Sequence, residues 1–263
     1  MRNLLIISNW KLHGNKYLIN HFINKISCVI KNCNFSIVIA PPLLYLDYMQ
    51  QIIKFYKCDN CILLSAQNID IHNYGSFTGE ISAKMLKDIG VKYAIVGHAD
   101  RKIFHKENNN IILKKFNILK SEGIFPILCI GETEREYQNN QTITICIKQI
   151  NNIINNLGIL ALQDTIIAYE PIWAIGNNII INPTYIQKIH NAIRNYLMQI
   201  NYKISKNIII QYGGSVNFTN ILNLLKQPDI DGVLIGKASL DTENFIKILN
   251  AINNNFIPSV ANI

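Results

Sequence analysis

A single carboxylate stands where an apolar strand should end. Residues Thr165–Tyr169 form a short apolar run that favours a buried strand, and Glu170 follows it directly. Pro171 cannot donate to a sheet ladder, so the strand ends there. The next residues, Ile-Trp-Ala-Ile-Gly, are strongly apolar for a loop, as expected of a segment that closes over a site and excludes water. A carboxylate beneath such a loop can act as a general base, although on spacing alone a surface glutamate beside a packed loop is the commoner case.

Other polar residues occupy equivalent positions, each just past the end of a short apolar run. Lys11 alone is most often a solvated cation, and His98 alone is most often a strand-end histidine with ordinary hydrogen bonds. Repeated coincidence is a weaker explanation than a shared site, because the carboxyl ends of parallel strands meet at one edge. The residues concerned are Asn9, Lys11, Gln67, Asn68, His98, Glu132, Glu170, Gly213, Gly214, Ser215, Gly236 and Lys237.

Short apolar runs alternate with amphipathic segments along the whole chain, at a spacing of roughly thirty residues. The runs are apolar on both faces, which favours strands of a parallel sheet covered by helices. The predicted strands are Leu4–Trp10, Ser36–Ala40, Cys61–Ala66, Tyr93–Val96, Phe125–Ile130, Thr165–Tyr169, Asn207–Gln211 and Gly232–Ile235. The predicted helices are Tyr17–Ile30, Leu43–Phe55, one ending at Ile89, Asn108–Glu122, Asn139–Leu157, Pro183–Ile200, Thr219–Leu225 and Thr242–Asn253.

Repeated strand–helix units without a linker or a shift in composition predict one α/β domain, a closed (β/α)8 TIM barrel over residues 1–263. The alternative is an open, doubly wound sheet. Such a sheet would leave edge strands with alternating or polar character, and none of the predicted strands has it. In a barrel the active site lies at the carboxyl ends of the strands, where the polar residues fall.

The composition restricts the partners that the chain could bind. A chain of 263 residues with 49% hydrophobic content can bury one large core, and it carries a net charge of +8. The lysines are scattered, and no basic run is interleaved with aromatic residues, which argues against nucleic acid as a partner. A small phosphorylated or carboxylated substrate fits the positive charge equally well.

The six cysteines predict free thiols in a reducing compartment. A chain of this size needs no disulfide framework, and Cys58-Asp-Asn-Cys61 has no second pair to complete a zinc site. The apolar run Leu4–Ile7 is too short for a signal-peptide core, and no run approaches the length of a membrane span. We therefore expect a cytoplasmic protein without a membrane partner.

The strand-end residues together could remove a proton next to a carbonyl group. Glycine-rich turns after the last two strands can bind a phosphate through backbone N–H groups, and Lys11 adds a positive charge. Glu170 can take a proton from carbon, and His98 can polarise a carbonyl if its imidazole is neutral. No metal cluster and no dinucleotide fingerprint accompanies them. The residues predict cofactor-free proton abstraction on a small phosphorylated compound.

These residues stand in motifs that resemble the triosephosphate isomerase family along essentially the whole chain. The segment Ala168–Gly176 is the most specific of the motifs, and all of them occur in the family's order. The others are Asn9-Trp10-Lys11, Ala66-Gln67-Asn68, Thr78-Gly79-Glu80, Val96-Gly97-His98, Cys129-Ile130-Gly131-Glu132-Thr133, Tyr212–Val216 and Gly236–Leu240.

The resemblance implies that dihydroxyacetone phosphate and D-glyceraldehyde 3-phosphate are interconverted through an enediolate, a reaction of glycolysis and gluconeogenesis. Glu170 would be the base and His98 the neutral electrophile. Lys11, with Asn9, would stabilise the developing oxyanion. No cofactor and no metal would be needed.

The resemblance also implies how the substrate's phosphate is held and enclosed. Residues Ala174–Gly176 would form the tip of a lid, between hinges at Pro171–Trp173 and near Ile179–Ile181. The loop that contains Thr78 would dock beside the active site of a second subunit, which implies a homodimer. The phosphate would be bound by backbone N–H groups of Gly176, Ser215, Gly236 and Lys237.

The sequence departs from the family pattern in three places. After His98 the family usually has Ser-Glu, where this chain has Ala99-Asp100. The missing hydroxyl implies a more mobile Glu170 in the resting enzyme and a modest loss of rate. The second lid hinge is more apolar than usual. Lys237 stands where a glycine is common, and its backbone contact survives if its φ is negative.

Two alternative functions remain open from the sequence. The chain could be a barrel isomerase that acts on a related sugar phosphate, or a binding or structural protein that has lost catalysis. Retention of the base, the electrophile and the lysine argues against the second alternative.

Overall fold

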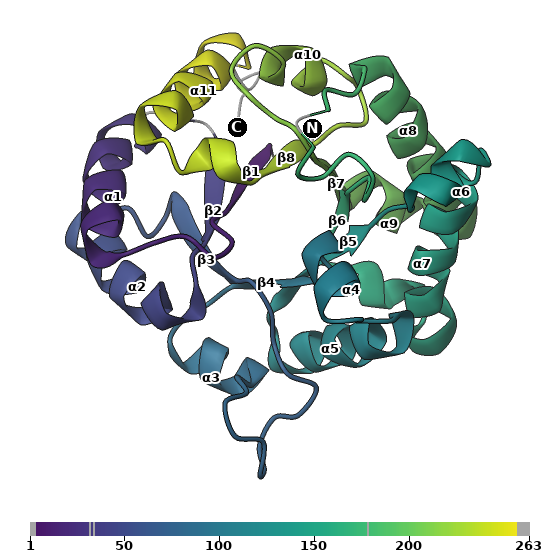
Figure 1. Ribbon diagram of the computed structural model, residues 1–263, viewed down its shortest axis with the longest axis horizontal. Coiled ribbons are helices and arrows are strands. Elements are labelled where there is room, and N and C mark those ends of the chain that lie inside the picture. The colour runs from purple at the N-terminus through teal and green to yellow at the C-terminus, as the bar shows by residue number, and fades with distance from the viewer. Residues whose placement is uncertain (1–3, 32, 34, 178, 257–263) are drawn as a thin grey trace.

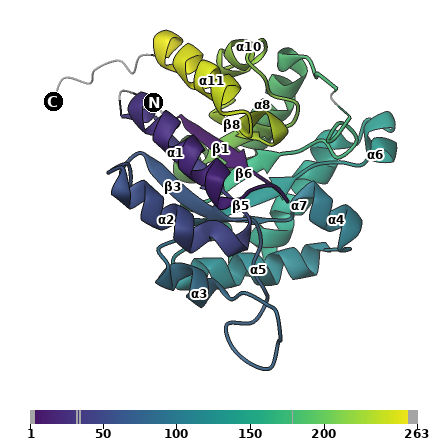
Figure 2. The same cartoon turned by 60° about the vertical axis from the view of Figure 1, so that its left-hand side comes forward.

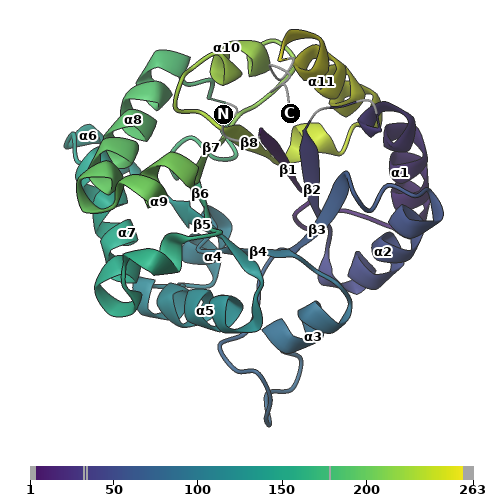
Figure 3. The same cartoon turned by 180° about the vertical axis from the view of Figure 1, so that it is seen from behind.

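The strands of this chain close into a barrel that is surrounded by helices. The computed structural model describes residues 4–31, 33, 35–177 and 179–256. Figures 1 and 3 show the ring of strands from opposite sides, with the helices outside it. The strands follow one another around the ring in sequence order, β1-β2-β3-β4-β5-β6-β7-β8, and β8 pairs with β1. The two ends of the predicted domain, residues 1–3 and 257–263, lie outside the described residues.

The eight strands all pair in parallel, so the predicted closed (β/α)8 barrel is confirmed. Seven predicted strands agree with the observed bounds to within a residue at each end. The remaining strand, β7, begins and ends two residues later than predicted because a short helix occupies Asn207. The strands are β1 (Leu5–Asn9), β2 (Ser36–Ala40), β3 (Ile62–Ala66), β4 (Tyr93–Val96), β5 (Phe125–Ile130), β6 (Ile166–Tyr169), β7 (Ile209–Gly213) and β8 (Gly232–Ile235).

Helices fill the connections between strands, and those predicted from apolar spacing are present. Their ends follow local capping: Asn182 accepts a hydrogen bond from the Thr184 N–H at the start of α8, with Pro183 in the first turn. Gly123 ends α5 in the left-handed conformation. These helices are α1 (Lys16–Ile30), α2 (Leu46–Phe55), α3 (Ala83–Asp88), α5 (Asn109–Glu122), α7 (Thr142–Leu157), α8 (Pro183–Ile200), α10 (Ile221–Leu225) and α11 (Thr242–Asn255).

Several short helices were not predicted, because five or six residues give too little periodicity to recognise. One of them has a signal that the sequence does carry: Thr133 and Glu136 form a reciprocal capping box at the start of α6. The short helices are α4 (Ala99–Phe104), α6 (Glu134–Gln138) and α9 (Tyr202–Asn207), with 3₁₀ turns η2 (Ile159–Leu162) and η3 (Lys237–Ser239). A third 3₁₀ turn, η1 (Leu43–Tyr45), forms the start of the predicted helix Leu43–Phe55. None of the described helices combines the length and hydrophobicity that a membrane-spanning helix requires.

Alternate residues of each strand face two separate hydrophobic cores. The larger core lies between the barrel and its helices, where Trp10 packs edge-on against Phe22, which stacks on Phe245. The smaller core fills the barrel itself with side chains such as Ile7 and Ala168. The barrel is therefore a packed support rather than a pore, and its strand ends are held rigidly.

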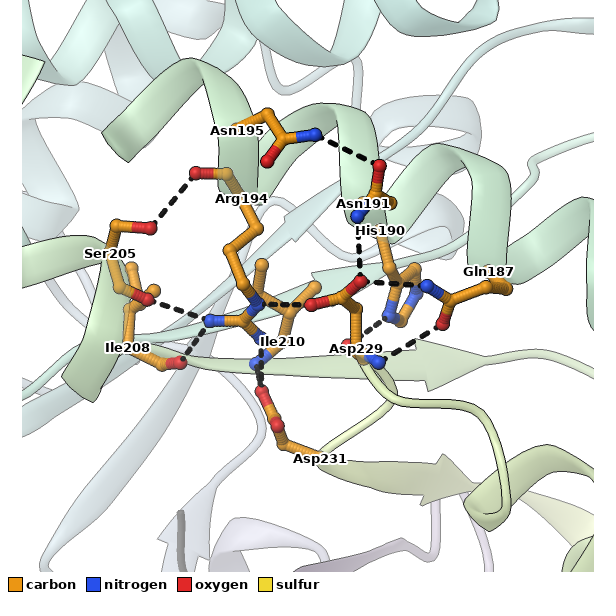
Figure 4. Close-up of polar contacts among 10 residues, drawn as sticks. All are labelled: Gln187, His190, Asn191, Arg194, Asn195, Ser205, Ile208, Ile210, Asp229 and Asp231. Atoms are coloured by element: carbon orange, nitrogen blue, oxygen red, sulfur yellow. Dashed lines mark hydrogen bonds and ion pairs between the residues drawn. The ribbon is translucent and has the colours of Figure 1, made fainter. Parts of the chain in front are cut away.

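A buried polar network behind β7 fastens α8 to the strands (Figure 4). The Arg194 guanidinium donates to Asp229 Oδ1 at 2.7 Å and to Asp231 Oδ2 at 2.5 Å. Asp231 Oδ2 also accepts a hydrogen bond from the Ile210 N–H of β7, at 2.8 Å. His190 is fully buried, and its Nδ1 lies 3.1 Å from the Asp229 carbonyl oxygen. Because burial penalises the charged imidazolium, the pKa of His190 is lowered to about 4.

We predict that His190 makes the protein less stable at mildly acidic pH. Its imidazole stays neutral in the folded state down to about pH 4, whereas the unfolded chain binds the proton near pH 6.5. The unfolded state therefore gains protons first, and the free energy of unfolding should fall by about 3 kcal/mol between pH 7 and pH 4 from this group. Urea denaturation of wild type and His190→Gln across that range measures the difference. An equal fall in both proteins would contradict the prediction.

Candidate active site

Glu170 lies just past the end of β6, with its carboxylate pointing toward the strands' common mouth. Its backbone N–H donates to the Ile130 carbonyl oxygen of β5 at 2.7 Å, which continues the sheet pairing by one residue. The residue is only 3% exposed. Gly213 makes room for it, because a Cβ at that position would lie 2.8 Å from Glu170 Cγ. The glycine at the end of β7 is thus a condition for placing the carboxylate there.

His98 follows β4 and reaches the same carboxylate. Gly97 has a φ of +71°, and a Cβ there would lie 3.2 Å from the Cys129 carbonyl oxygen. That turn places His98 at the N-terminus of α4, where its Nδ1 accepts a hydrogen bond from the Asp100 N–H at 3.0 Å. An Nδ1 that accepts is unprotonated, so the neutral ring carries its hydrogen on Nε2. His98 Nε2 lies 3.3 Å from Glu170 Oε1, so both groups reach one small volume.

A backbone amide holds the glutamate where the family usually has a serine hydroxyl. The Ala99 N–H donates to Glu170 Oε2 at 3.2 Å. Ala99 itself is buried at 1% exposure. The carboxylate therefore has one partner on each oxygen without the hydroxyl. The greater mobility expected for Glu170 stays a prediction.

Lys11 leaves β1 in a left-handed conformation, with a φ of +51°. The strain is compensated by local contacts: its N–H donates to Asn9 Oδ1 at 3.0 Å, and its carbonyl accepts from Gln67 Nε2 at 2.9 Å. The ammonium lies 3.0 Å from the Asp100 carboxylate, and both side chains are about one-third exposed. Asn9 is nearly buried, at 4% exposure. The lysine is thus aimed by neighbouring strands and remains open to solvent.

The turns after β7 and β8 lie next to each other and to Lys11. The strands pair up to Gly213 and Leu234, so Ser215 and Gly236 leave adjacent strand ends. A Cβ added to Gly236 would lie 3.8 Å from Lys11 Cε, which shows that the lysine stem passes over this glycine. Lys237 begins η3 and is not among the residues with positive φ. The condition for a backbone contact at Lys237 is therefore met.

Glu132 anchors the segment that follows Glu170. Its Oε1 accepts hydrogen bonds from Trp173 Nε1 at 2.8 Å and from the Tyr169 hydroxyl at 3.1 Å, and its backbone oxygen accepts from the Ile172 N–H. The Trp173 ring stacks on Tyr137 with centroids 4.2 Å apart. Glu132 is fully buried, and burial raises its pKa. The sequence placed this residue at a strand end but gave it no role, and only the structure shows its partner.

The predicted lid runs on from this anchor. Ala174 is buried and turns back, its N–H bonding the Pro171 carbonyl at 2.9 Å. Gly176 is exposed and has a φ of +81°. Ile179 and Ile180 are 38% and 59% exposed, whereas Ile181 is buried in the larger core, so the apolar second hinge packs only at its last residue. Asn178, which precedes that hinge, lies outside the described residues. No described contact brings Gly176 to the other site residues in this structure.

The structure therefore brings together most of the residues that the sequence singled out. Glu170 and His98 share one volume, and Lys11 lies between Asp100 and the turn at Gly236. Within the described ranges, no group of three or more His, Cys, Asp and Glu side chains is arranged to hold a metal ion.

Comparison with known proteins gives one consistent family. The family model described as "Triosephosphate isomerase" matches residues 4–252. The chain is 50% identical over 255 residues to the triosephosphate isomerase of Baumannia cicadellinicola subsp. Homalodisca coagulata, covering 95% of this chain and 97% of that protein. It is 49% identical to that of Blochmanniella floridana, covering 97% of each chain. It is 44% identical to that of Photorhabdus laumondii subsp. laumondii, covering 95% of this chain and 97% of the relative.

Proposed function

This chain belongs to the triosephosphate isomerase family and interconverts dihydroxyacetone phosphate and D-glyceraldehyde 3-phosphate, and we propose that Glu170 moves the proton in this reaction. The observation that supports this role is the carboxylate's position. It is nearly shielded from water and lies within 3.3 Å of the His98 imidazole, at the mouth of the barrel. A poorly hydrated carboxylate is a stronger base toward carbon than one in bulk water.

Glu170 first removes a proton from the carbon next to the substrate carbonyl. The C–H electron pair then forms the carbon–carbon double bond of an enediolate, and negative charge develops on the former carbonyl oxygen. The protonated Glu170 returns the proton to the neighbouring carbon, which gives the other triose phosphate. One carboxylate can serve both carbons because they are one bond apart.

His98 and Lys11 stabilise the charge that develops on oxygen. The N–H of Asp100 occupies His98 Nδ1, so the Nε2–H is left to donate to the enediolate oxygen. The ammonium of Lys11 adds a point charge, and Asn9 fixes the backbone from which the lysine extends. A neutral imidazole can also move the hydroxyl proton between the two oxygens, because it returns to its starting state when the proton transfer is complete.

Backbone N–H groups at Ser215, Gly236 and Lys237 bind the phosphate, with Gly176 added when the lid closes. Adjacent strand ends and the stem of Lys11 beside Gly236 support this placement. Closure of residues Ala174–Gly176 would exclude water and limit loss of phosphate from the enediolate. The bond between Trp173 and Glu132 fastens one end of the lid.

Replacing Glu170 with Asp tests the assignment of the base. The shorter side chain withdraws the carboxylate from carbon, so we expect kcat to fall by about a hundredfold or more in a coupled assay with D-glyceraldehyde 3-phosphate. Inhibition by inorganic phosphate should be unchanged, because the phosphate turns are untouched. Glu243→Asp, at an exposed glutamate of α11, is the matched control and should keep full activity. A Glu170→Asp enzyme with normal turnover would show that another group is the base.

Restoring the family's usual residues after His98 tests the cost of the departure. A serine at Ala99 adds a hydroxyl beside Glu170 Oε2, and a glutamate at Asp100 lengthens the partner of Lys11. We expect Ala99→Ser with Asp100→Glu to raise kcat modestly, by less than about tenfold. Steady-state kinetics of the double variant and of wild type measure this change in kcat. An unchanged kcat would show that the missing hydroxyl does not limit the rate.

We also propose that the chain forms one barrel domain over residues 1–263 and works as a homodimer in the cytoplasm. The cytoplasmic assignment is supported by the thiols of Cys33, Cys58, Cys61, Cys129 and Cys146, which form no disulfide in the described part of the chain. The dimer is supported by the loop between β3 and α3, which projects away from the barrel (Figures 1 and 2). Within it, His72 stacks on Phe77 with centroids 3.6 Å apart, so the loop is internally ordered.

Large apolar side chains are exposed on this loop and on the loops after β1 and β2, which are its neighbours in the barrel. Leu12 is 93% exposed, Leu44 83% and Tyr74 90%. Such a concentration at one side is typical of a surface that a second subunit covers. A second copy of the chain is the partner that the family implies.

A charge at this surface should separate the subunits. We expect Leu44→Glu to shift the protein from dimer to monomer at micromolar concentration, measured by size-exclusion chromatography with light scattering. Leu160→Glu is the control, because Leu160 is 67% exposed but lies in η2, before the start of β6 and away from these loops. A wild-type protein that is already monomeric would contradict the proposal.

A further inference from the structure

Lys102 is a cation turned toward the interior behind the active site. Its Nζ donates to the backbone oxygen of Cys129 in β5, at 3.0 Å. Lys102 is partly buried, and burial lowers the pKa of its ammonium. An interior ammonium is costly unless a nearby negative charge compensates it. The surroundings of Lys102 should therefore contain that charge.

Four titratable groups on the surrounding elements act on the pKa of Lys102. They are Glu170 after β6, Glu107 in the connection between α4 and α5, and the thiols of Cys129 in β5 and Cys146 in α7. The negative charges of Glu170 and Glu107 each raise the pKa of Lys102. Burial holds the pKa of both thiols well above their usual range, so the thiols stay neutral.

Glu107 already has two other cations as partners. It forms ion pairs with Arg101 and with Lys115, the latter at 2.5 Å. Glu170 has no such partner: among the described residues, no lysine or arginine nitrogen lies within 4.0 Å of its carboxylate. Lys102 is consequently the interior cation whose charge is left to act on Glu170.

Lys102 also joins two elements that contact Glu170, α4 and β5. It belongs to α4, the helix whose first residue, Ala99, donates its N–H to Glu170 Oε2. Its other contact, Cys129, lies in β5, where the next residue, Ile130, accepts the backbone N–H of Glu170 at 2.7 Å. Moving the ammonium would loosen both contacts to Glu170.

We propose that Lys102 is a positioning residue for the catalytic base, holding Ala99 and Cys129 against Glu170 and supplying a buried positive charge behind it. The inference rests on the proposed role of Glu170. Through its contact with Cys129, Lys102 keeps the carboxylate oxygens of Glu170 aimed at the substrate carbon. Lys102 touches no substrate atom in this account.

The pH dependence of catalysis distinguishes this role from simple capping of a carbonyl. A lysine that only stabilises the fold would change the melting temperature and leave the acidic limb of kcat/KM in place. A lysine whose charge acts on the base must move that limb to higher pH when the charge is removed, because protonation of the base becomes easier.

The experiment compares three substitutions at this position with a surface control. Lys102→Met removes the charge and the donor at nearly constant length, Lys102→Gln keeps a donor without charge, and Lys102→Arg keeps both. Lys114→Met removes one exposed positive charge from α5. Each variant is checked for folding by circular dichroism, and kcat, KM and inhibition by inorganic phosphate are measured from pH 5 to pH 9.

We expect Lys102→Met to lower kcat by about tenfold with KM and phosphate inhibition little changed, and to raise the acidic limb of kcat/KM by about one pH unit. Lys102→Gln should shift the acidic limb of kcat/KM to higher pH by the same amount. If Lys102→Met does not fold, Lys102→Gln provides the test. Lys102→Arg and Lys114→Met should resemble wild type.

A wild-type acidic limb in a folded neutral variant overturns the inference. Glu170→Asp separates this failure from failure of the proposed function. If that variant loses turnover while Lys102→Gln keeps the wild-type limb, Glu170 is the base and Lys102 does not act on it.

Discussion

The site depends on one constraint: in each parallel strand of the closed barrel, the same alternate residues must face the inside of the barrel. Successive residues of a strand face opposite sides, so a residue two past an inward-facing one also faces inward. Ile7, Ala168 and Leu234 line the inside of the barrel. Two residues beyond them come Asn9, Glu170 and Gly236. A slip of one residue in the pairing of any strand would point its strand-end residue toward the helices instead of the mouth of the barrel.

The same geometry crowds the mouth, and glycine resolves the crowding. A Cβ at Gly131 would lie 1.9 Å from the Glu170 carbonyl oxygen, and one at Gly213 would meet the Glu170 side chain. These positions cannot carry side chains while Glu170 keeps its place. The glycines beside Glu170 are therefore part of the candidate site in the same sense as the polar residues, because they define the space into which the carboxylate projects.

Apolar periodicity and the polar residues at strand ends were enough to predict most of the fold and many of the candidate site residues. The apolar runs were enough to predict the barrel, because each strand is buried on both faces and needs no partner to be recognised. Contacts between distant residues could not be predicted in this way. The bond from Trp173 to Glu132, separated by 41 residues, and the bond from Gln67 to Lys11, separated by 56, depend on how loops pack in three dimensions. The sequence gives the residue types but not these pairings.

Several contacts in the site are made by backbone N–H groups rather than by side chains. This explains how the chain tolerates its departures from the family pattern. The Ala99 N–H holds one oxygen of Glu170, and the Asp100 N–H sets the tautomer of His98. Neither contact depends on the side chain at its position, so both survive replacement of serine and glutamate there. The proposed phosphate contact of the Lys237 N–H likewise needs no glycine, because Lys237 is not among the residues with positive φ. Groups whose chemistry the backbone cannot supply are the carboxylate of Glu170, the imidazole of His98 and the ammonium of Lys11. Under the proposed mechanism, we expect substitution to be restricted most strictly at those three residues and at the glycines that give them room. The remaining positions of the proposed site can change as long as the strand ends stay where they are.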